Sequence, residues 1–203
     1  MKIIKVKITT TTETLGTNPA DKDIFAEFIA SNAPDAKSRK EEIEEIGAQE
    51  YEDKSVTVHS KDKDGNPFIW DYQIKGFFKS AAAAGSYQGG DKKLTAYKKK
   101  IDLNVHIFAI DDDTDRKLMM HIPEGKEMGW CVRPLRAQTM QGERVALAKS
   151  ETVPEGTWFE CQIHILDDSL EKYVRQWLDY GKYNGLLQWR NSGKGRFTWE
   201  EIK

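Results

Sequence analysis

Four segments of this chain alternate apolar and polar residues, and two others carry a single apolar stripe at helical spacing. Alternation puts every second side chain on one face of a strand, whereas residues three and four apart share one face of a helix. One-sided elements of both kinds bury their apolar faces against each other, which predicts an α+β protein built on an antiparallel sheet. The predicted strands cover residues 2–13, 101–110, 157–166 and 195–202, and the predicted helices cover 72–84 and 168–180.

The two helices should cover the same face of that sheet, because each has only one apolar side. Asp71 is placed to cap the first helix, while Asp168 and Glu171 have the spacing of a capping box for the second. The large side chains expected against the sheet are Phe77, Phe78, Trp177 and Leu178.

The connections between these elements contain shorter patterns. Asn18 followed by Pro19 is typical of a helix start, and a highly charged second helix is expected at 36–47. Asp64-Gly65 is a hairpin signal. The remaining strand-like segments are 56–58, 68–70, 118–122 and 130–135.

Length and composition favour a cytoplasmic protein without a membrane partner. The chain has 203 residues with a formal net charge of -2, and 38% of them are hydrophobic, enough to bury the core of one large domain. No apolar run approaches the roughly 20 residues that a bilayer requires, and the alternating start does not resemble a signal peptide. Cys131 and Cys161 lack CxxC spacing, so we expect buried free thiols and no metal site through sulfur.

Residues that could carry catalysis do not fall into a motif. The four histidines match no signature, and the chain lacks a Walker loop, an HExxH motif and a Ser-His-Asp order. The acidic run Asp111–Asp115 offers oxygen ligands for magnesium or calcium, but it lacks the spacing of a calcium loop, which favours a solvated turn. The sequence therefore favours a protein without cofactor, metal or enzymatic activity.

The most distinctive segment runs from Gly181 to Trp199 and reads GKYNGLLQWRNSGKGRFTW. Glycine lets the main chain approach a ligand and turn its amides toward an anion, and basic side chains suit phosphate. Trp189 adds a flat face for stacking. An ordinary basic surface loop would have the same composition. The candidate phosphate-binding residues of this segment are Arg190, Gly193, Lys194, Gly195 and Arg196.

Two other stretches add positive charge. Lys75 and Lys79 lie four residues apart on the outer side of the first helix, and residues 131–149 hold four positive charges against one negative. Basic side chains interleaved with aromatic ones suit a sequence-tolerant binder of single strands, in which stacking contributes about 1–3 kcal/mol per base. The cations of residues 131–149 are Arg133, Arg136, Arg144 and Lys149.

Three motifs resemble the RAMP superfamily, the RNA-binding backbone and processing subunits of CRISPR effector complexes. QIKGFFKSA (73–81) is similar to the family's SLKGxLR helix start, and ERVALAKSETVPEGTWFECQIHIL (143–166) resembles an outward arm that leads into a vPxGTxFxFxI strand. NGLLQWRNSGKGRF (184–197) is similar to the C-terminal loop written near GGxxSRGxGR. Together the motifs follow the family's order and cover roughly a third of the chain.

The resemblance implies a ferredoxin-like (RRM-like) βαββαβ fold, consistent with the order of the six main elements. It implies a single domain over 1–203, with insertions at about 15–66 and 111–153. It also implies binding of single-stranded RNA along the open sheet face and the glycine-rich loop, within a CRISPR-type ribonucleoprotein complex. The loop departs from the family at Trp189-Arg190-Asn191, and the chain is short for a backbone subunit. A stand-alone relative encoded by a phage or prophage fits these departures better.

Two other classes of function remain open. One is a protein-binding mimic or inhibitor of a CRISPR or other defence complex. The other is a metal-independent endoribonuclease with His106 or His164 as general acid or base, although exposed strand histidines are more often inert. Single-stranded DNA could replace RNA as the ligand, and the sequence is compatible with an oligomer.

Overall fold

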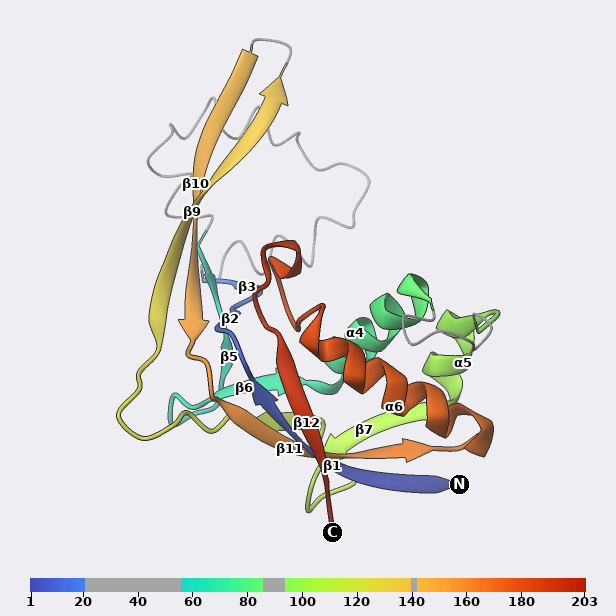
Figure 1. The fold of residues 1–203 in the computed structure, drawn as a ribbon. Coiled ribbons are helices and arrows are strands. Elements are labelled where there is room, and N and C mark those ends of the chain that lie inside the picture. Colours follow the sequence, from blue (N-terminus) through green and yellow to red (C-terminus); the bar gives the residue numbers. More distant parts are fainter. Residues whose placement is uncertain (21–55, 86–93, 140–141) are drawn as a thin grey trace, which may run out of the picture.

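The computed structural model describes residues 1–20, 56–85, 94–139 and 142–203, except for the side chains of 135–147. Its main sheet has four antiparallel strands in the order β12-β1-β11-β7 (Figure 1). The fold is α+β, as the sequence predicts. The four strands are β1 (Lys2–Thr10), β7 (Val105–Ala109), β11 (Trp158–Ile165) and β12 (Phe197–Ile202).

The alternation in β1 sets which face of this sheet is buried. Ile4, Val6 and Ile8 are at most 1% exposed, whereas the side chains between them face outward. Val6 lies opposite Cys161, which is a buried free thiol whose pKa is raised to about 12 by burial. Cys131 is also free but only half-buried, so the expectation of two buried thiols is met at Cys161 alone.

Helices α4 (Asp71–Ala84) and α6 (Glu171–Asp179) lie on the same side of the sheet (Figure 1). The ring of Phe78 lies 5.6 Å from that of Trp177, which joins the two helices, and the ring of Phe77 lies 5.1 Å from that of Phe197 on β12. All four large side chains expected against the sheet are buried in one core. Short 3-10 turns, η1 (Asp168–Leu170) and η2 (Tyr180–Lys182), flank α6.

The remaining strands form two further sheets. One has the order β2-β10-β4-β3, with β9 on β10, and the other has the order β5-β6-β8. The prediction of a single antiparallel sheet is therefore wrong for these strands, which lie in two separate sheets. Their bounds are β2 (Thr14–Leu15), β3 (Asn18–Pro19), β4 (Thr57–Val58), β5 (Ser60–Lys61), β6 (Pro67–Trp70), β8 (Lys117–Met119), β9 (Gly129–Thr139) and β10 (Gly142–Val153).

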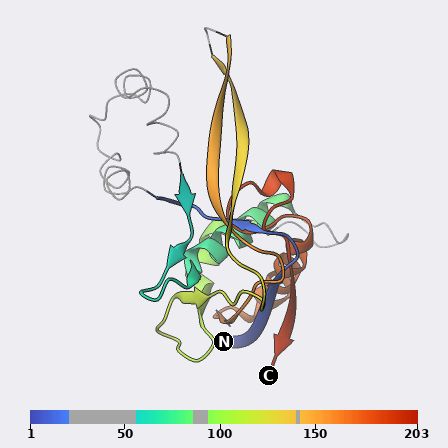
Figure 2. The same cartoon turned by 90° about the vertical axis from the view of Figure 1, so that its left-hand side faces the viewer.

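Strands β9 and β10 pair from Gly129↔Thr152 to Thr139↔Gly142 and form an arm that projects from the body (Figures 1 and 2). Short strands hold only its base. Thr152 pairs with Leu15 of β2, and Ser150 pairs with Thr57 of β4. The outer part of the arm therefore extends beyond the rest of the described fold.

The strand predicted at 101–110 is wrong over its first four residues. Helix α5 (Tyr97–Asn104) occupies them, and β7 begins only at Val105. Ile101 is buried, Leu103 is 58% exposed, and the Asn104 amide donates to the Lys100 carbonyl oxygen at 3.0 Å, as a helix permits. Residues 101 and 105 are four positions apart and would therefore share one face in either a strand or a helix, so the apolar pattern did not distinguish the two structures.

The helix start predicted at Asn18-Pro19 is also wrong. These residues form β3 and pair with Val58 and Thr57 of β4, and the Asn18 amide donates to Ser60 Oγ at 2.7 Å. Tertiary pairing outweighs the local capping pattern here. The rest of that expected helix and the charged helix at 36–47 lie outside the described residues.

The two predicted helix caps differ in detail. Trp70 is the N-cap of α4, its amide donates to Gln73 Oε1 at 2.9 Å, and Asp71 pairs with Arg116 at 2.9 Å. Before α6, Asp167 rather than Asp168 caps the turn, by accepting from the Ser169 amide. Helix α4 nevertheless begins at Asp71, where residue 72 was predicted, and α6 begins at Glu171, where residue 168 was predicted.

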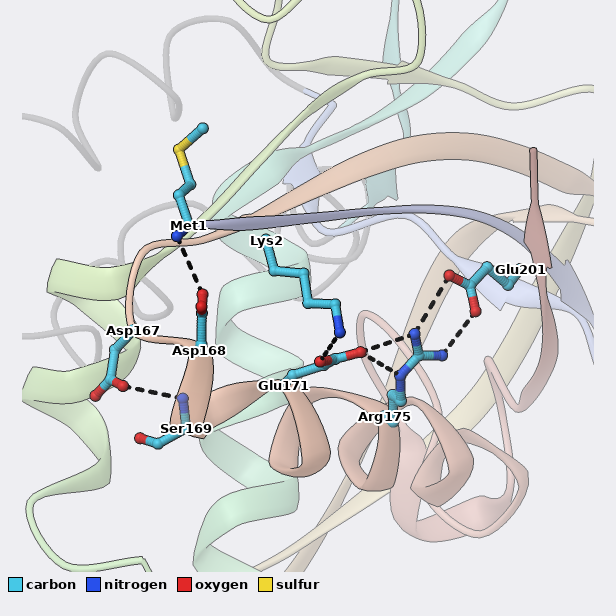
Figure 3. Close-up of polar contacts among 8 residues, drawn as sticks. All are labelled: Met1, Lys2, Asp167, Asp168, Ser169, Glu171, Arg175 and Glu201. Atoms are coloured by element: carbon cyan, nitrogen blue, oxygen red, sulfur yellow. Dashed lines mark hydrogen bonds and ion pairs between the residues drawn. The ribbon is translucent and has the colours of Figure 1, made fainter.

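A polar network ties α6 to the first and last strands (Figure 3). Glu171 accepts from Lys2 Nζ at 2.5 Å and from Arg175 at 3.0 Å, and Arg175 also reaches Glu201 at 2.8 Å. The Lys2 ammonium, followed by Arg175, lowers the pKa of Glu171. The network joins β1, α6 and β12 across the outside of the core.

Among the described residues, no helix is long and apolar enough to cross a membrane.

Candidate nucleic-acid interface

The C-terminal glycine-rich loop, residues 181–196, folds back on itself through glycine contacts. The Leu186 amide donates to the Gly195 carbonyl oxygen at 2.8 Å, and the Gly195 amide donates to the Glu13 carbonyl oxygen at 2.9 Å. Gly195 has φ +72°, and a Cβ there would lie 2.2 Å from the Leu186 oxygen; at Gly185 it would lie 2.2 Å from Lys194 and Gly195 atoms. These two glycines are required by the fold of the loop itself.

The far side of the loop is attached to the segment after β1. Thr12 Oγ1 donates to the Gly193 carbonyl oxygen at 3.0 Å and accepts from the Arg196 amide at 2.9 Å. Gly193 has φ +81°, and a Cβ there would contact the Arg196 guanidinium at 3.3 Å. The Lys194 ammonium forms an ion pair with Glu13, which neutralises part of its charge.

A buried arginine joins the loop to the base of the arm. Arg133 is 7% exposed, donates to Ser150 Oγ at 3.1 Å and to Gln188 Oε1 at 3.0 Å, and lies 4.8 Å from the ring centroid of Trp189. The Gln188 amide in turn donates to Thr57 Oγ1 at 2.8 Å. Arg133 and Trp189 thus position the loop, and one face of the tryptophan ring is already covered.

The opposite face of the arm carries an exposed aromatic ring. Trp130 is 52% exposed, and the Lys149 ammonium lies 4.7 Å from its ring centroid. Val132, the partner of Lys149 in the β9–β10 register, is 57% exposed. Alternation along β9 turns these side chains away from Arg133, so the arm has an inner face held by the loop and an outer face open to solvent.

The remaining predicted cations lie apart from the loop. Lys79 pairs with Asp102 of α5 at 2.7 Å. Burial lowers the pKa of Lys75, against the opposing effect of the Asp71 and Asp102 carboxylates. Neither lysine lines the pocket described below. Arg136 and Arg144 occupy successive positions of the arm, opposite Val145 and Ala137, in the part whose side chains are outside the described residues.

A pocket of about 520 Å³ lies between the loop and α4. Arg190, the first residue of the 3-10 turn η3 (Arg190–Ser192), lines it on the loop side. Neither Arg190 nor Arg196 forms an ion pair with a described residue. The pocket is lined by Thr17, Asn18, Pro19, Tyr72, Gln73, Gly76, Phe77, Leu187 and Arg190.

All four histidines and the acidic run lie within the described residues. His59 is buried and its pKa is lowered by burial, while His106 and His164 lie opposite each other on β7 and β11. His121 stacks on Trp158 at 4.2 Å. In the acidic run, Asp112 accepts from Thr114 within an exposed turn. No group of three or more potential metal ligands occurs within the part of the chain that the structure describes.

Sequence reasoning missed several residues of this region. It selected Trp189 for stacking, whereas Trp130 is the more exposed ring beside a cation. The strand pattern contained this information, because residues 130 and 132 share one face of a strand and residues 131 and 133 share the other. Tyr72 and Gly76 of α4 were missed because the loop residues that line the same pocket, Leu187 and Arg190, are more than 100 residues away in the sequence.

Comparison with known proteins gives a match in structure only. No family model and no curated sequence matches this chain. A chain of the cryo-EM structure of the type III-B Cmr-beta bound to cognate target RNA is similar, with a TM-score of 0.57 and 14% identity over 99% of this chain and 58% of that chain. The chain shares its fold with a CRISPR complex subunit.

This protein thus spans little more than half the length of that Cmr-beta chain. A chain of a type IV-B CRISPR complex is also similar, with a TM-score of 0.45 and 12% identity over 99% of this chain and 90% of that one. The Cmr-beta match is a likeness of fold.

Proposed function

We propose that this protein is a RAMP-like subunit that binds single-stranded RNA without cleaving it. The observation that carries the proposal is the loop beside the pocket, where Arg190 and Arg196 have no ion-pair partner among the described residues. Uncompensated guanidinium groups suit phosphate oxygens. Trp130 with Lys149 on the outer face of the arm forms a second contact region, which combines a stacking face with a cation.

The order of elements supports the family assignment within this proposal. Strand β1, helix α4, strands β7 and β11, helix α6 and strand β12 follow one another as in a ferredoxin-like βαββαβ unit, and the sheet order β12-β1-β11-β7 fits it. We infer one domain over 1–203 with insertions at about 15–66 and 111–153. The arm belongs to the second insertion.

Arg133, Trp189 and Lys194 have supporting roles in this proposal. Arg133 and Trp189 fix the loop against the arm, and Lys194 is held by Glu13. The direct contacts are assigned to Arg190, Arg196, Lys149 and Trp130. By analogy with the Cmr-beta complex, we also propose a larger ribonucleoprotein complex as the setting in which this strand is bound.

Fluorescence anisotropy with labelled single-stranded RNA, single-stranded DNA and duplex RNA tests the proposal. Wild-type protein should bind the RNA strand more tightly than the duplex, and Arg190→Ala should weaken this binding about tenfold, as expected for a lost hydrogen bond to a charged group. Lys63→Ala, an exposed charge on the β5–β6 turn, is the control and should bind like the wild type. Absence of RNA binding by the wild type would refute the proposal.

The protein-binding alternative makes a different prediction. A mimic or inhibitor of a CRISPR complex would capture its partner from a host extract after nuclease treatment, whereas an RNA-bridged partner would be lost. Retention of a stoichiometric partner after nuclease treatment, together with no RNA affinity, would favour that alternative.

A further inference from the structure

Gly76 is a helical residue for which the fold gives no reason. It lies inside α4, where glycine is less favourable than alanine because it restricts the backbone least in the unfolded chain. Its φ is outside the left-handed region, and a Cβ built on it meets no atom within 4 Å. Gly195, by contrast, would place a Cβ 2.2 Å from a carbonyl oxygen. Packing and backbone geometry thus explain Gly195 but not Gly76.

The absence of a side chain at Gly76 matters because this residue lines the pocket between α4 and the glycine-rich loop. A bare helix surface allows a flat group to approach the backbone closely. Leu187 adds apolar surface, and Tyr72, which is 53% exposed, adds an aromatic ring. These neighbours suit a planar aromatic ligand.

The polar groups of the pocket suit a phosphate and the edge of a base. Arg190 supplies a cation with no ion-pair partner among the described residues. The Gln73 amide donates to Thr17 Oγ1 at 3.0 Å, which holds it at the pocket wall. At about 520 Å³, the volume lies within the range of roughly 300–1,000 Å³ that is common for small-molecule sites.

We propose that this pocket holds one nucleotide, with its base against the bare surface at Gly76 and its phosphate at Arg190. The inference rests on the proposed function, because it assigns to the pocket one nucleotide of the bound strand. A free nucleotide has the same chemistry, so both single-stranded RNA and free nucleoside 5′-monophosphates are tested as ligands.

Filling the pocket from Gly76 is the direct test. Gly76→Leu places an isobutyl group in the space that the base would occupy and should weaken binding of single-stranded RNA at least tenfold. The matched control is Ala83→Leu, an exposed position seven residues, or about 10 Å, farther along the same helix, which should bind like the wild type. Gly76→Ala is the conservative variant and should weaken binding severalfold while raising the midpoint of thermal unfolding by about 2–4 °C.

The outcomes separate this inference from the proposed function. If the wild type binds RNA and both Gly76 variants, folded, bind it equally well, the nucleotide pocket is refuted while RNA binding stands. If the wild type does not bind RNA, the proposed function fails, and titration with nucleoside 5′-monophosphates decides about the pocket. Saturable binding that Gly76→Leu abolishes and Ala83→Leu retains would then support a free-nucleotide site, and no binding would overturn it.

Discussion

At the residue scale, Gly195 and Gly193 should respond differently to substitution. Both have positive φ, which costs a non-glycine residue about 1–3 kcal/mol, but only at Gly195 would a Cβ meet a backbone oxygen at 2.2 Å. At Gly193 it would meet the flexible Arg196 side chain. Gly195→Ala should therefore lower the free energy of unfolding by more than Gly193→Ala, as measured by urea denaturation. Equal losses would contradict the assignment of Gly195 to the loop fold.

The two tryptophans beside the arm should separate stability from binding. Trp130→Ala removes an exposed ring and should change the unfolding free energy by no more than about 0.5 kcal/mol while weakening RNA binding. Trp189→Ala should cost about 2 kcal/mol, because it leaves the buried Arg133 without its stacking partner. Urea denaturation and anisotropy on both variants measure the two effects. The reverse assignment of losses would show that Trp189 is the stacking residue.

Individual residues show where sequence reasoning reached its limit. The loop cations and glycines were selected as one candidate cluster because they are close in sequence. The pairing of Lys194 with Glu13 was not predicted, because the two residues are 181 positions apart. The burial of Arg133 was not predicted either, because its partners Ser150 and Gln188 are 17 and 55 positions away. Burial and pairing of a charged side chain are tertiary properties that a local pattern does not contain.

At the element scale, the ion pairs that join β1, α6 and β12 predict a loss of stability in acid. The pKa of Glu171 is lowered by Lys2 and Arg175, and that of Glu201 by Arg175, so both carboxylates stabilise the folded state when ionised. This contribution is complete above their unfolded pKa values and is lost as the pH falls through the lower, folded values. The temperature at the midpoint of thermal unfolding should therefore decrease as the pH is lowered below about 5.

Glu171→Gln is the variant that tests this network. It should reduce the stability at pH 7 and flatten its decrease between about pH 5 and 3, because one of the titrating groups is gone. Glu155→Gln is the control, since its ion pair with Lys126 lies on a loop beside the arm and outside this network. An unchanged pH profile in Glu171→Gln would contradict the role given to Glu171.

The elements also show how much of the fold the sequence could predict. Strands β1, β11 and β12 and helices α4 and α6 were predicted close to their bounds, because each buries one face at a regular period. Helix α5 was missed because Ile101 and Val105 fit both periods, and β3 because Asn18 finds its partner in β4. A short element held by tertiary pairing has too little local pattern to be recognised.

At the scale of the whole molecule, we expect RNA binding without cleavage. The purified protein should not cleave single-stranded RNA with or without magnesium. His106 Nε2 contacts the Leu103 carbonyl oxygen at 3.3 Å and His164 Nε2 contacts Gln162 Oε1 at 3.1 Å, and no group of three or more potential metal ligands occurs among the described residues. Gel analysis of end-labelled RNA measures this. Cleavage that disappears in His106→Ala or His164→Ala would instead establish a metal-independent nuclease.

The salt dependence of RNA binding counts the phosphates that the protein neutralises. Each lost phosphate contact should reduce the slope of log affinity against log salt by about 0.7 for single strands. Arg190→Ala with Arg196→Ala should therefore flatten the slope by about 1.4, and Lys194→Ala should have a smaller effect because Glu13 pairs with it. If the double variant remains folded and keeps the slope of the wild type and of Lys63→Ala, the loop does not bind the phosphates of the strand.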